Sequence, residues 1–140
     1  MNTPANPAVR ARGGCLCEGV SYEIRGPLRD VIACHCSQCR KTSGHFVAAT
    51  QALTADLVLT ESATLRWYRS SDTAERGFCN RCGGNLFWRP TALEAGVVSI
   101  MAGTLDPPTG LKTARHIYVA DKSDYHDVAG GPQHSGDWPD

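Results

Sequence analysis

The chain has 140 residues, no formal net charge at pH 7, and 41% hydrophobic against 20% charged residues. This length fits one domain around a single core, and the zero net charge gives no general attraction to nucleic acid or to an anionic membrane, so neither partner is expected. No segment approaches the roughly 20 apolar residues of a membrane span, and the N-terminus lacks the apolar core of a signal peptide, so the expected location is the cytoplasm.

The predicted elements are short strands separated by turns, which indicates a mainly β fold with little helix. Residues 1–12 are predicted to be a flexible lead-in. Val20, Tyr22 and Ile24 then alternate with polar residues, as in a half-buried strand that ends at a Gly-Pro turn. Further strands are predicted at residues 31–33, 46–50, 65–68, 85–88, 97–101 and 116–119.

Three stretches lack a clear strand pattern. Residues 54–59 stay ambiguous, because Thr54 could cap a helical turn whereas the apolar residues after it suit a strand. Residues 103–110 contain two glycines and two prolines and are expected to form a loop. Residues 121–140 are polar and are predicted to form a tail packed on or near the domain of residues 13–120.

Seven cysteines occur in a chain without an export signal, a combination that disfavours a disulfide framework. Clustered free thiols in a reducing compartment are typical of metal ligands, and inert buried thiols are the alternative. The cysteines fall into sets of four and three, which predicts two zinc ions per chain.

The first set contains Cys15, Cys17, Cys79 and Cys82. On an extended strand, residues two apart project to the same face, so the first two sulfurs can meet one ion. The second pair has the spacing of a tight knuckle, in which backbone N–H groups point at the first sulfur and Gly83 takes a positive φ. Together they predict a closed structural zinc site with four thiolate ligands.

A zinc ion with four thiolate ligands carries a formal charge of −2. Arg76 and Arg81 flank the knuckle in the sequence and are expected to offset part of this charge. Because the two cysteine pairs are far apart in the sequence, zinc ligation would tie the start of the fold to its middle.

The second set, Cys34, Cys36 and Cys39, lies within six residues, and no eighth cysteine is available to complete it. Three protein ligands and one vacant position are typical of a reactive zinc site. The fourth ligand could be water, a substrate thiol or a histidine. On an extended segment His35 should point away from the neighbouring sulfurs.

Two other histidines, His45 and His116, are distant candidates for the fourth position, although a surface or hydrogen-bonded role is the simpler interpretation. A zinc ion with three thiolates already carries a formal charge of −1. It is therefore a poorer Lewis acid than a zinc ion with three histidines and is better suited to holding a thiol as its thiolate.

The residues after the second set are cationic or small, namely Arg40, Lys41, Ser43 and Gly44. They would form a positively charged, open rim suited to an anionic thiol such as glutathione. We therefore predict Arg40, Lys41 and Ser43 as substrate-binding residues, with a solvated turn as the alternative. No residue is predicted as a catalytic acid or base.

In the order of these motifs the chain resembles the glutathione-dependent formaldehyde-activating enzyme family, which also includes centromere protein V. The matching segments are residues 13–22, 34–44, 68–71, 75–87, 103–106 and 116–117. The resemblance implies a β-tent of short antiparallel sheets stapled by zinc. It also implies the same division of the cysteines, with the four as the structural set and the three as the catalytic set.

The resemblance implies a carbon–sulfur lyase or synthase that joins glutathione to formaldehyde and gives S-hydroxymethylglutathione. Zinc is then the expected cofactor, and a small thiol, possibly glutathione, is the expected partner. The alternative is a non-enzymatic zinc-binding module for a protein or RNA partner. Residues 66–69, which combine two arginines with two aromatic residues, would offer that module a small contact patch.

Overall fold

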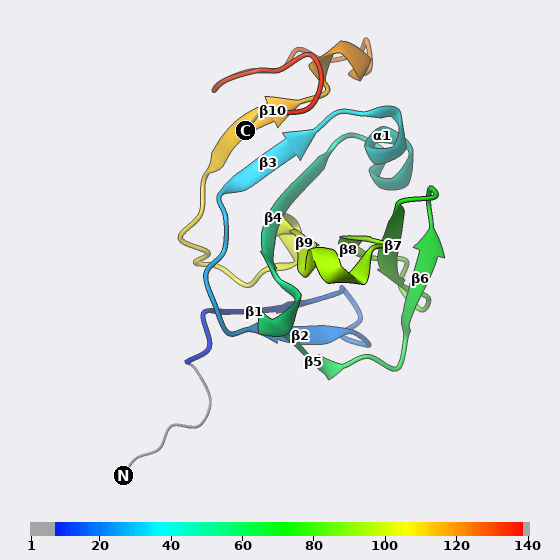
Figure 1. Cartoon of the computed structure of the whole chain (residues 1–140), viewed down its shortest axis with the longest axis vertical. Helices are drawn as coiled ribbons and strands as arrows, with labels where there is room; N and C mark the ends of the chain where they lie inside the picture. Colours follow the sequence, from blue (N-terminus) through cyan, green and yellow to red (C-terminus); the bar gives the residue numbers. More distant parts are fainter. Residues whose placement is uncertain (1–7, 139–140) are drawn as a thin grey trace.

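The computed structural model describes residues 8–138 and consists of two β-sheets, one α-helix and short 3₁₀ turns (Figure 1). The predicted mainly β fold is confirmed, since strands hold 41% of the residues and helical turns 14%. The strands are β1 Ala11–Gly14, β2 Ser21–Ile24, β3 Val31–Cys34, β4 Val47–Leu53, β5 Leu57–Glu61, β6 Leu65–Arg69, β7 Ala74–Cys79, β8 Asn85–Pro90, β9 Val97–Met101 and β10 Thr113–Ile117. The helix is α1 Ser37–Ser43, and the 3₁₀ turns are η1 Thr54–Asp56, η2 Leu93–Ala95, η3 Ala102–Thr104 and η4 Val119–Asp121.

The strands form a three-stranded sheet in the order β1-β2-β5 and a seven-stranded sheet in the order β10-β3-β4-β9-β8-β7-β6. All pairs are antiparallel except β10 and β3, which run parallel. In Figure 1 the larger sheet curves from β10 at the top to β6 at the right, and the smaller sheet lies below it. The parallel pair departs from the expected antiparallel sheets.

Strand alternation gives the larger sheet two different faces. On β9, Val98 and Ile100 join the main core, whereas Ser99 and Met101 point the other way. Side chains of β2 close this core from the smaller sheet, with Tyr22 packed edge-on against Phe87 at 5.5 Å between ring centroids. The main core therefore lies between the two sheets. The opposite face of the larger sheet is not part of this core.

The predicted strands are confirmed, except that the strand predicted at 116–119 ends at Ile117, because Tyr118 adopts a left-handed backbone and η4 begins at Val119. The ambiguous residues 54–59 resolve into η1 followed by β5. Two strands, β1 and β7, were not predicted. The first begins at Ala11, inside the predicted lead-in, whose residues 1–7 lie outside the described part of the chain. The second contains a glycine and a charged residue at inward positions, which hides its alternation in the sequence. The predicted domain boundaries stay predictions.

Helix α1 also escaped prediction, because seven residues are too few to show an apolar period. Its N-cap is Cys36, whose sulfur accepts the N–H of Cys39, and its C-cap is Gly44 in the left-handed region, with φ 83°. Within residues 8–138 no helix has the length and apolar character needed to cross a bilayer.

The C-terminal segment 132–136 runs along the outer side of β10. The N–H of His134 donates to the carbonyl of His116 at 2.9 Å, and the N–H of Tyr118 donates to the carbonyl of Gly136 at 2.8 Å. These main-chain bonds bring the last described residues to the end of β10.

Candidate metal centres

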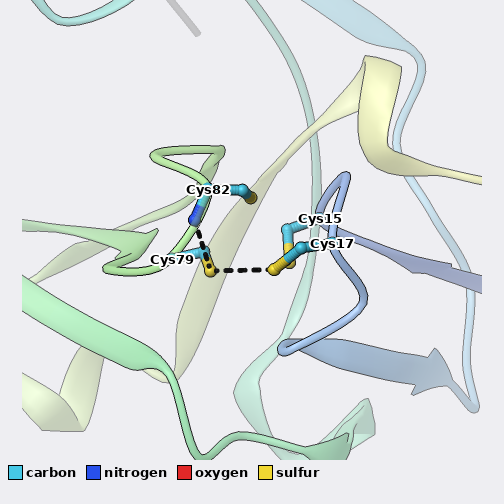
Figure 2. A group of neighbouring side chains, drawn as sticks. All are labelled: Cys15, Cys17, Cys79 and Cys82. Carbon is cyan, nitrogen blue, oxygen red and sulfur yellow. Dashed lines mark hydrogen bonds between the residues drawn. The ribbon is translucent and has the colours of Figure 1, made fainter.

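The four-cysteine cluster (Cys15, Cys17, Cys79 and Cys82) joins the turn after β1 to the turn after β7, with the four sulfurs within 4.8 Å of one another (Figure 2). The Sγ atoms of Cys15 and Cys17 are 3.7 Å apart, and those of Cys17 and Cys79 are 3.6 Å apart. A tetrahedron with Zn–S bonds of about 2.3 Å has S···S distances of about 3.8 Å, whereas a disulfide needs about 2.05 Å. All four thiols are free, and their arrangement fits zinc.

Cys79 lies at the centre of a knuckle of hydrogen-bond donors. The N–H groups of Arg81 and Cys82 lie 3.3 and 3.4 Å from its sulfur, and Gly83 has φ 78°, so the predicted knuckle geometry is confirmed. The hydroxyl of Thr64 is 3.1 Å from the same sulfur and is the main cause that lowers the pKa of Cys79 to about 5. These donors stabilise a thiolate, the form in which cysteine binds zinc.

The prediction that Cys15 and Cys17 lie on an extended strand was wrong. Strand β1 ends at Gly14, and the two cysteines occupy a tight turn in which Glu18 has φ 63°. The N–H of Val20 folds back onto the Cys15 sulfur at 3.3 Å. The turn, rather than a strand face, therefore brings the two sulfurs together.

Of the two arginines expected at the knuckle, only Arg81 lies there. Its Nε donates to the Cys17 sulfur at 3.3 Å, and this contact is the main cause of its raised pKa. Arg76 instead places a terminal nitrogen 3.9 Å from the sulfur of Cys39, which corrects the prediction. The reason is that Arg76 and Cys79 are an odd number of residues apart on β7, so their side chains point to opposite faces of the sheet.

The three-cysteine cluster (Cys34, Cys36 and Cys39) forms within a single segment, with its sulfurs also within 4.8 Å of one another. Cys34 ends β3, Cys36 caps α1, and Cys39 sits in the first helical turn. Hydrogen bonds from the other two thiols lower the pKa of Cys36 to about 2, whereas hydrogen bonds to those thiols raise the pKa of Cys34. The three thiols thus share hydrogen bonds with one another. A divalent cation bound between them would stabilise them as thiolates.

His35 points away from the neighbouring sulfurs, as predicted. It is 1% exposed, stacks on Phe46 and hydrogen-bonds through Nε2 to Nδ1 of His116 at 3.0 Å, and burial lowers its pKa to about 4. His45 contacts the hydroxyl of Tyr125. Within residues 8–138, therefore, no histidine joins the group of three sulfurs.

A cavity of about 710 Å³ lies beside the three-cysteine cluster. Its floor is the face of the larger sheet opposite the main core, where Val47, Ala49, Ala74 and Ser99 present small side chains. The three cysteines form part of its wall. Small side chains on the floor leave room for a ligand next to the sulfurs.

The predicted substrate-binding residues Arg40, Lys41 and Ser43 do not belong to the lining of this cavity. The Arg40 Nε donates to the carbonyl of Asp121 at 2.8 Å, Lys41 is exposed, and the Ser43 hydroxyl donates to the carbonyl of Cys39 at 2.7 Å. Their role in substrate binding stays a prediction.

Two cations that the sequence did not reveal, Arg29 and Arg76, line the cavity, together with Tyr118, Asp137 and Trp138. Tyr118 has a left-handed backbone, with φ 55° and ψ 38°, which is uncommon for a residue with a side chain and frequent at functional sites. Burial, followed by Asp137, raises its pKa. Tyr118 lies near Asp137 and Trp138 because the chain reverses direction after β10. No local sequence pattern predicts this reversal.

Comparisons with known proteins place the chain in a family. Residues 10–121, more than half of the chain, match the family model described as glutathione-dependent formaldehyde-activating enzyme. A Schizosaccharomyces pombe protein described as an uncharacterized lyase is 32% identical over 80 residues, which cover 56% of this chain and 57% of that relative. The chain thus spans a little over half the length of this curated relative. A crystal structure of a Rhodobacter sphaeroides protein superposes with a TM-score of 0.57 and 25% identity, over 69% of this chain and 88% of the other.

Proposed function

The chain belongs to the glutathione-dependent formaldehyde-activating enzyme family, and on that premise we propose that it is a zinc-dependent carbon–sulfur lyase or synthase. Its substrate would be the adduct of a small, glutathione-like thiol with formaldehyde. Two zinc ions per chain are part of the proposal, one in the four-cysteine cluster and one in the three-cysteine cluster.

One observation carries this proposal. Three cysteine sulfurs lie within 4.8 Å of one another on the wall of a cavity of about 710 Å³, and no fourth ligand from residues 8–138 joins them. A closed site would serve structure alone, whereas a ligand position that faces a cavity is accessible to a substrate. When bound there, zinc would supply the positive charge that holds a substrate sulfur as its thiolate.

The reaction forms one carbon–sulfur bond while the carbonyl π bond of the aldehyde breaks. The proton that the thiol loses ends on the former carbonyl oxygen, so atoms and charge balance. Tyr118 lines the cavity, and its hydroxyl, like that of any tyrosine with a pKa of about 10, is protonated at neutral pH. We propose that this hydroxyl donates a hydrogen bond to the oxygen on which negative charge develops. The small side chains of the floor leave the aldehyde access to the sulfur.

The test is exchange spectroscopy with ¹³C-formaldehyde and glutathione, which measures adduct formation and breakdown at equilibrium. Zinc-loaded protein should accelerate the exchange above the uncatalysed rate. Cys39→Ser should abolish the acceleration while the protein stays folded, and Lys112→Gln, at an exposed lysine outside the cavity lining, serves as the control. An uncatalysed rate in the presence of protein with two bound zinc ions would contradict the proposed activity.

The alternative function, a non-enzymatic module that binds a protein or RNA, would use β6. There Tyr68 is 62% exposed between Arg66 and Arg69. Both guanidinium groups, however, donate to nearby main-chain carbonyls, which reduces their availability to phosphates. The cavity beside the three-cysteine cluster favours the enzyme.

A further inference from the structure

Arg76 is a buried cation for which the described residues provide no carboxylate partner. Its exposed fraction is 5%, and the ion pairs found within residues 8–138 involve other arginines. A buried charge is unfavourable unless an opposite charge and hydrogen bonds compensate for it. Because Arg76 lines the cavity beside Cys39, that compensation can come from a ligand.

The hydrogen bonds that this guanidinium donates to the protein are all long. Its terminal nitrogens lie 3.5 Å from the hydroxyl of Thr42 and 3.5 Å from the side-chain oxygen of Gln38, both at the outer limit of a hydrogen bond. Its Nε is buried and has no partner among the described residues. The Nε edge of an arginine offers two parallel N–H groups, which match the two oxygens of a carboxylate.

Arg29 provides a second cation on the same cavity. Its Nε and one terminal nitrogen donate to the main-chain carbonyls of Asp30 and Ala49, at 3.2 and 3.1 Å, and burial lowers its pKa. No carboxylate of residues 8–138 forms an ion pair with it.

The position of the Arg29 guanidinium follows from the strand register. It contacts Ala49, which is two residues along β4 from Val47, and Val47 pairs with Cys34. Two residues of a strand span about 7 Å, so this guanidinium lies farther along the cavity than Arg76, which sits beside the cluster itself.

We propose that Arg76 and Arg29 bind two carboxylates of the thiol substrate, so that the cavity selects a thiol with two carboxylates over thiols without them. This inference rests on the proposed function, because it requires the substrate sulfur to reach the three-cysteine cluster. Arg76 holds the carboxylate near the sulfur, and Arg29 holds the more distant one.

The test measures the affinity of zinc-loaded protein for three thiols by calorimetry under anaerobic conditions. Glutathione carries both carboxylates, its diethyl ester carries neither, and mercaptoethanol is neutral and short. Wild type should bind glutathione about tenfold or more tightly than the ester, as expected for hydrogen bonds to a charged group. Arg76→Gln and Arg29→Gln should each remove most of this preference and leave mercaptoethanol binding unchanged. Arg66→Gln, on the exposed β6, should behave as wild type.

Equal affinity of wild type for glutathione and its diethyl ester would overturn the inference, and this comparison needs no variant to fold. Loss of zinc from the three-cysteine cluster in Arg76→Gln, with all three thiols weakened equally, would also overturn it. Arg76 would then only balance the charge of the cluster. If wild type binds no thiol at all, the proposed function fails as well, so the two failures are distinguishable.

Discussion

The two cysteine clusters use the same spacings, Cys-x-Cys and Cys-x-x-Cys, in very different surroundings. In the four-cysteine cluster the two spacings lie on turns of different sheets, and Cys17 and Cys79 are 62 residues apart. In the three-cysteine cluster the spacings overlap within one segment at the end of β3. The first cluster is bordered by main-chain N–H groups and Arg81, and the second by a cavity.

This difference predicts that two sites with the same ligand type have different roles. A site that joins distant segments contributes to folding free energy, because its ligands meet only when the chain is folded. A local site can form from one segment, so its loss should reduce the free energy of unfolding less. Its cavity, rather than its sulfurs, is then what suits it to chemistry.

The largest expected effect is on stability, and it separates the clusters directly. Cys79→Ser should leave the protein unfolded or insoluble, because structural zinc binding is worth about 10–16 kcal/mol in small domains whose total stability is about 5–15 kcal/mol. Thermal melts followed by circular dichroism, with zinc content measured in parallel, provide the measurement.

Cys39→Ser is the matched variant in the other cluster. It should lower the melting temperature much less and reduce the zinc content from two ions per chain to one. If the Cys39 variant is the less stable of the two, the roles of the clusters are reversed.

A chelator should remove zinc from the two clusters at different rates. The three-cysteine cluster faces the cavity, so its zinc should be released first, whereas the other zinc is enclosed by turns and should follow only on unfolding. A zinc-sensitive dye should report two phases of equal amplitude, and the circular dichroism should change only in the second. A single phase that releases both ions together with unfolding would contradict the comparison.

An alkaline titration tests how much Tyr22, which lies in the main core with Cys15 and Cys79, contributes to the free energy of unfolding. Burial raises the pKa of Tyr22 to about 12, against about 10 in an unfolded chain, so the neutral phenol stabilises the fold below pH 10. As pH rises from 10 to 12, up to about 3 kcal/mol of unfolding free energy should be lost.

Urea unfolding at a series of pH values measures this loss. Tyr22→Phe should flatten the pH dependence, at the cost of about 1 kcal/mol for the hydrogen bond to Thr104, which is 2.7 Å long. Tyr68→Phe, at an exposed tyrosine, is the control and should retain the slope. The same slope in the Tyr22 variant would show that another group titrates.

The smallest expected effect comes from Arg81, which contacts both the sulfur and the carbonyl of Cys17. Arg81→Gln removes a charge next to the four-cysteine cluster and should lower the melting temperature by a few degrees, with zinc content unchanged. Arg66→Gln is the control. A loss of thiol binding in the Arg81 variant would contradict the separation of the two clusters.

The elements that could be predicted from the sequence are those with local patterns. Alternation from Val20 to Ile24 predicted β2 and its buried face, and the Cys79–Cys82 spacing followed by Gly83 predicted a knuckle with its N–H donors. Such features depend only on residues that are close together in the chain, so a single sequence is enough to predict them.

The residues that could not be predicted depend on distant strands. Arg76 is three residues from Cys79 in the sequence, so on strand β7 the two side chains point to opposite faces of the larger sheet and reach different clusters. The sequence alone did not show that residues 74–79 form a strand. Helix α1 is capped by the sulfur of Cys36, which is not among the usual capping groups. Arg29 reaches the cavity only because β3 pairs with β4.

The C-terminal segment along β10 has a consequence for how copies of the molecule meet. Unpaired strand edges attract other chains, and residues 132–136 cover the β10 edge of the larger sheet with main-chain bonds. Of the two ends of that sheet, β6 is the one that the described residues leave open. It carries the exposed side chains of Arg66 and Arg69. Two copies that approach through this edge bring like charges together, so the open edge resists self-association.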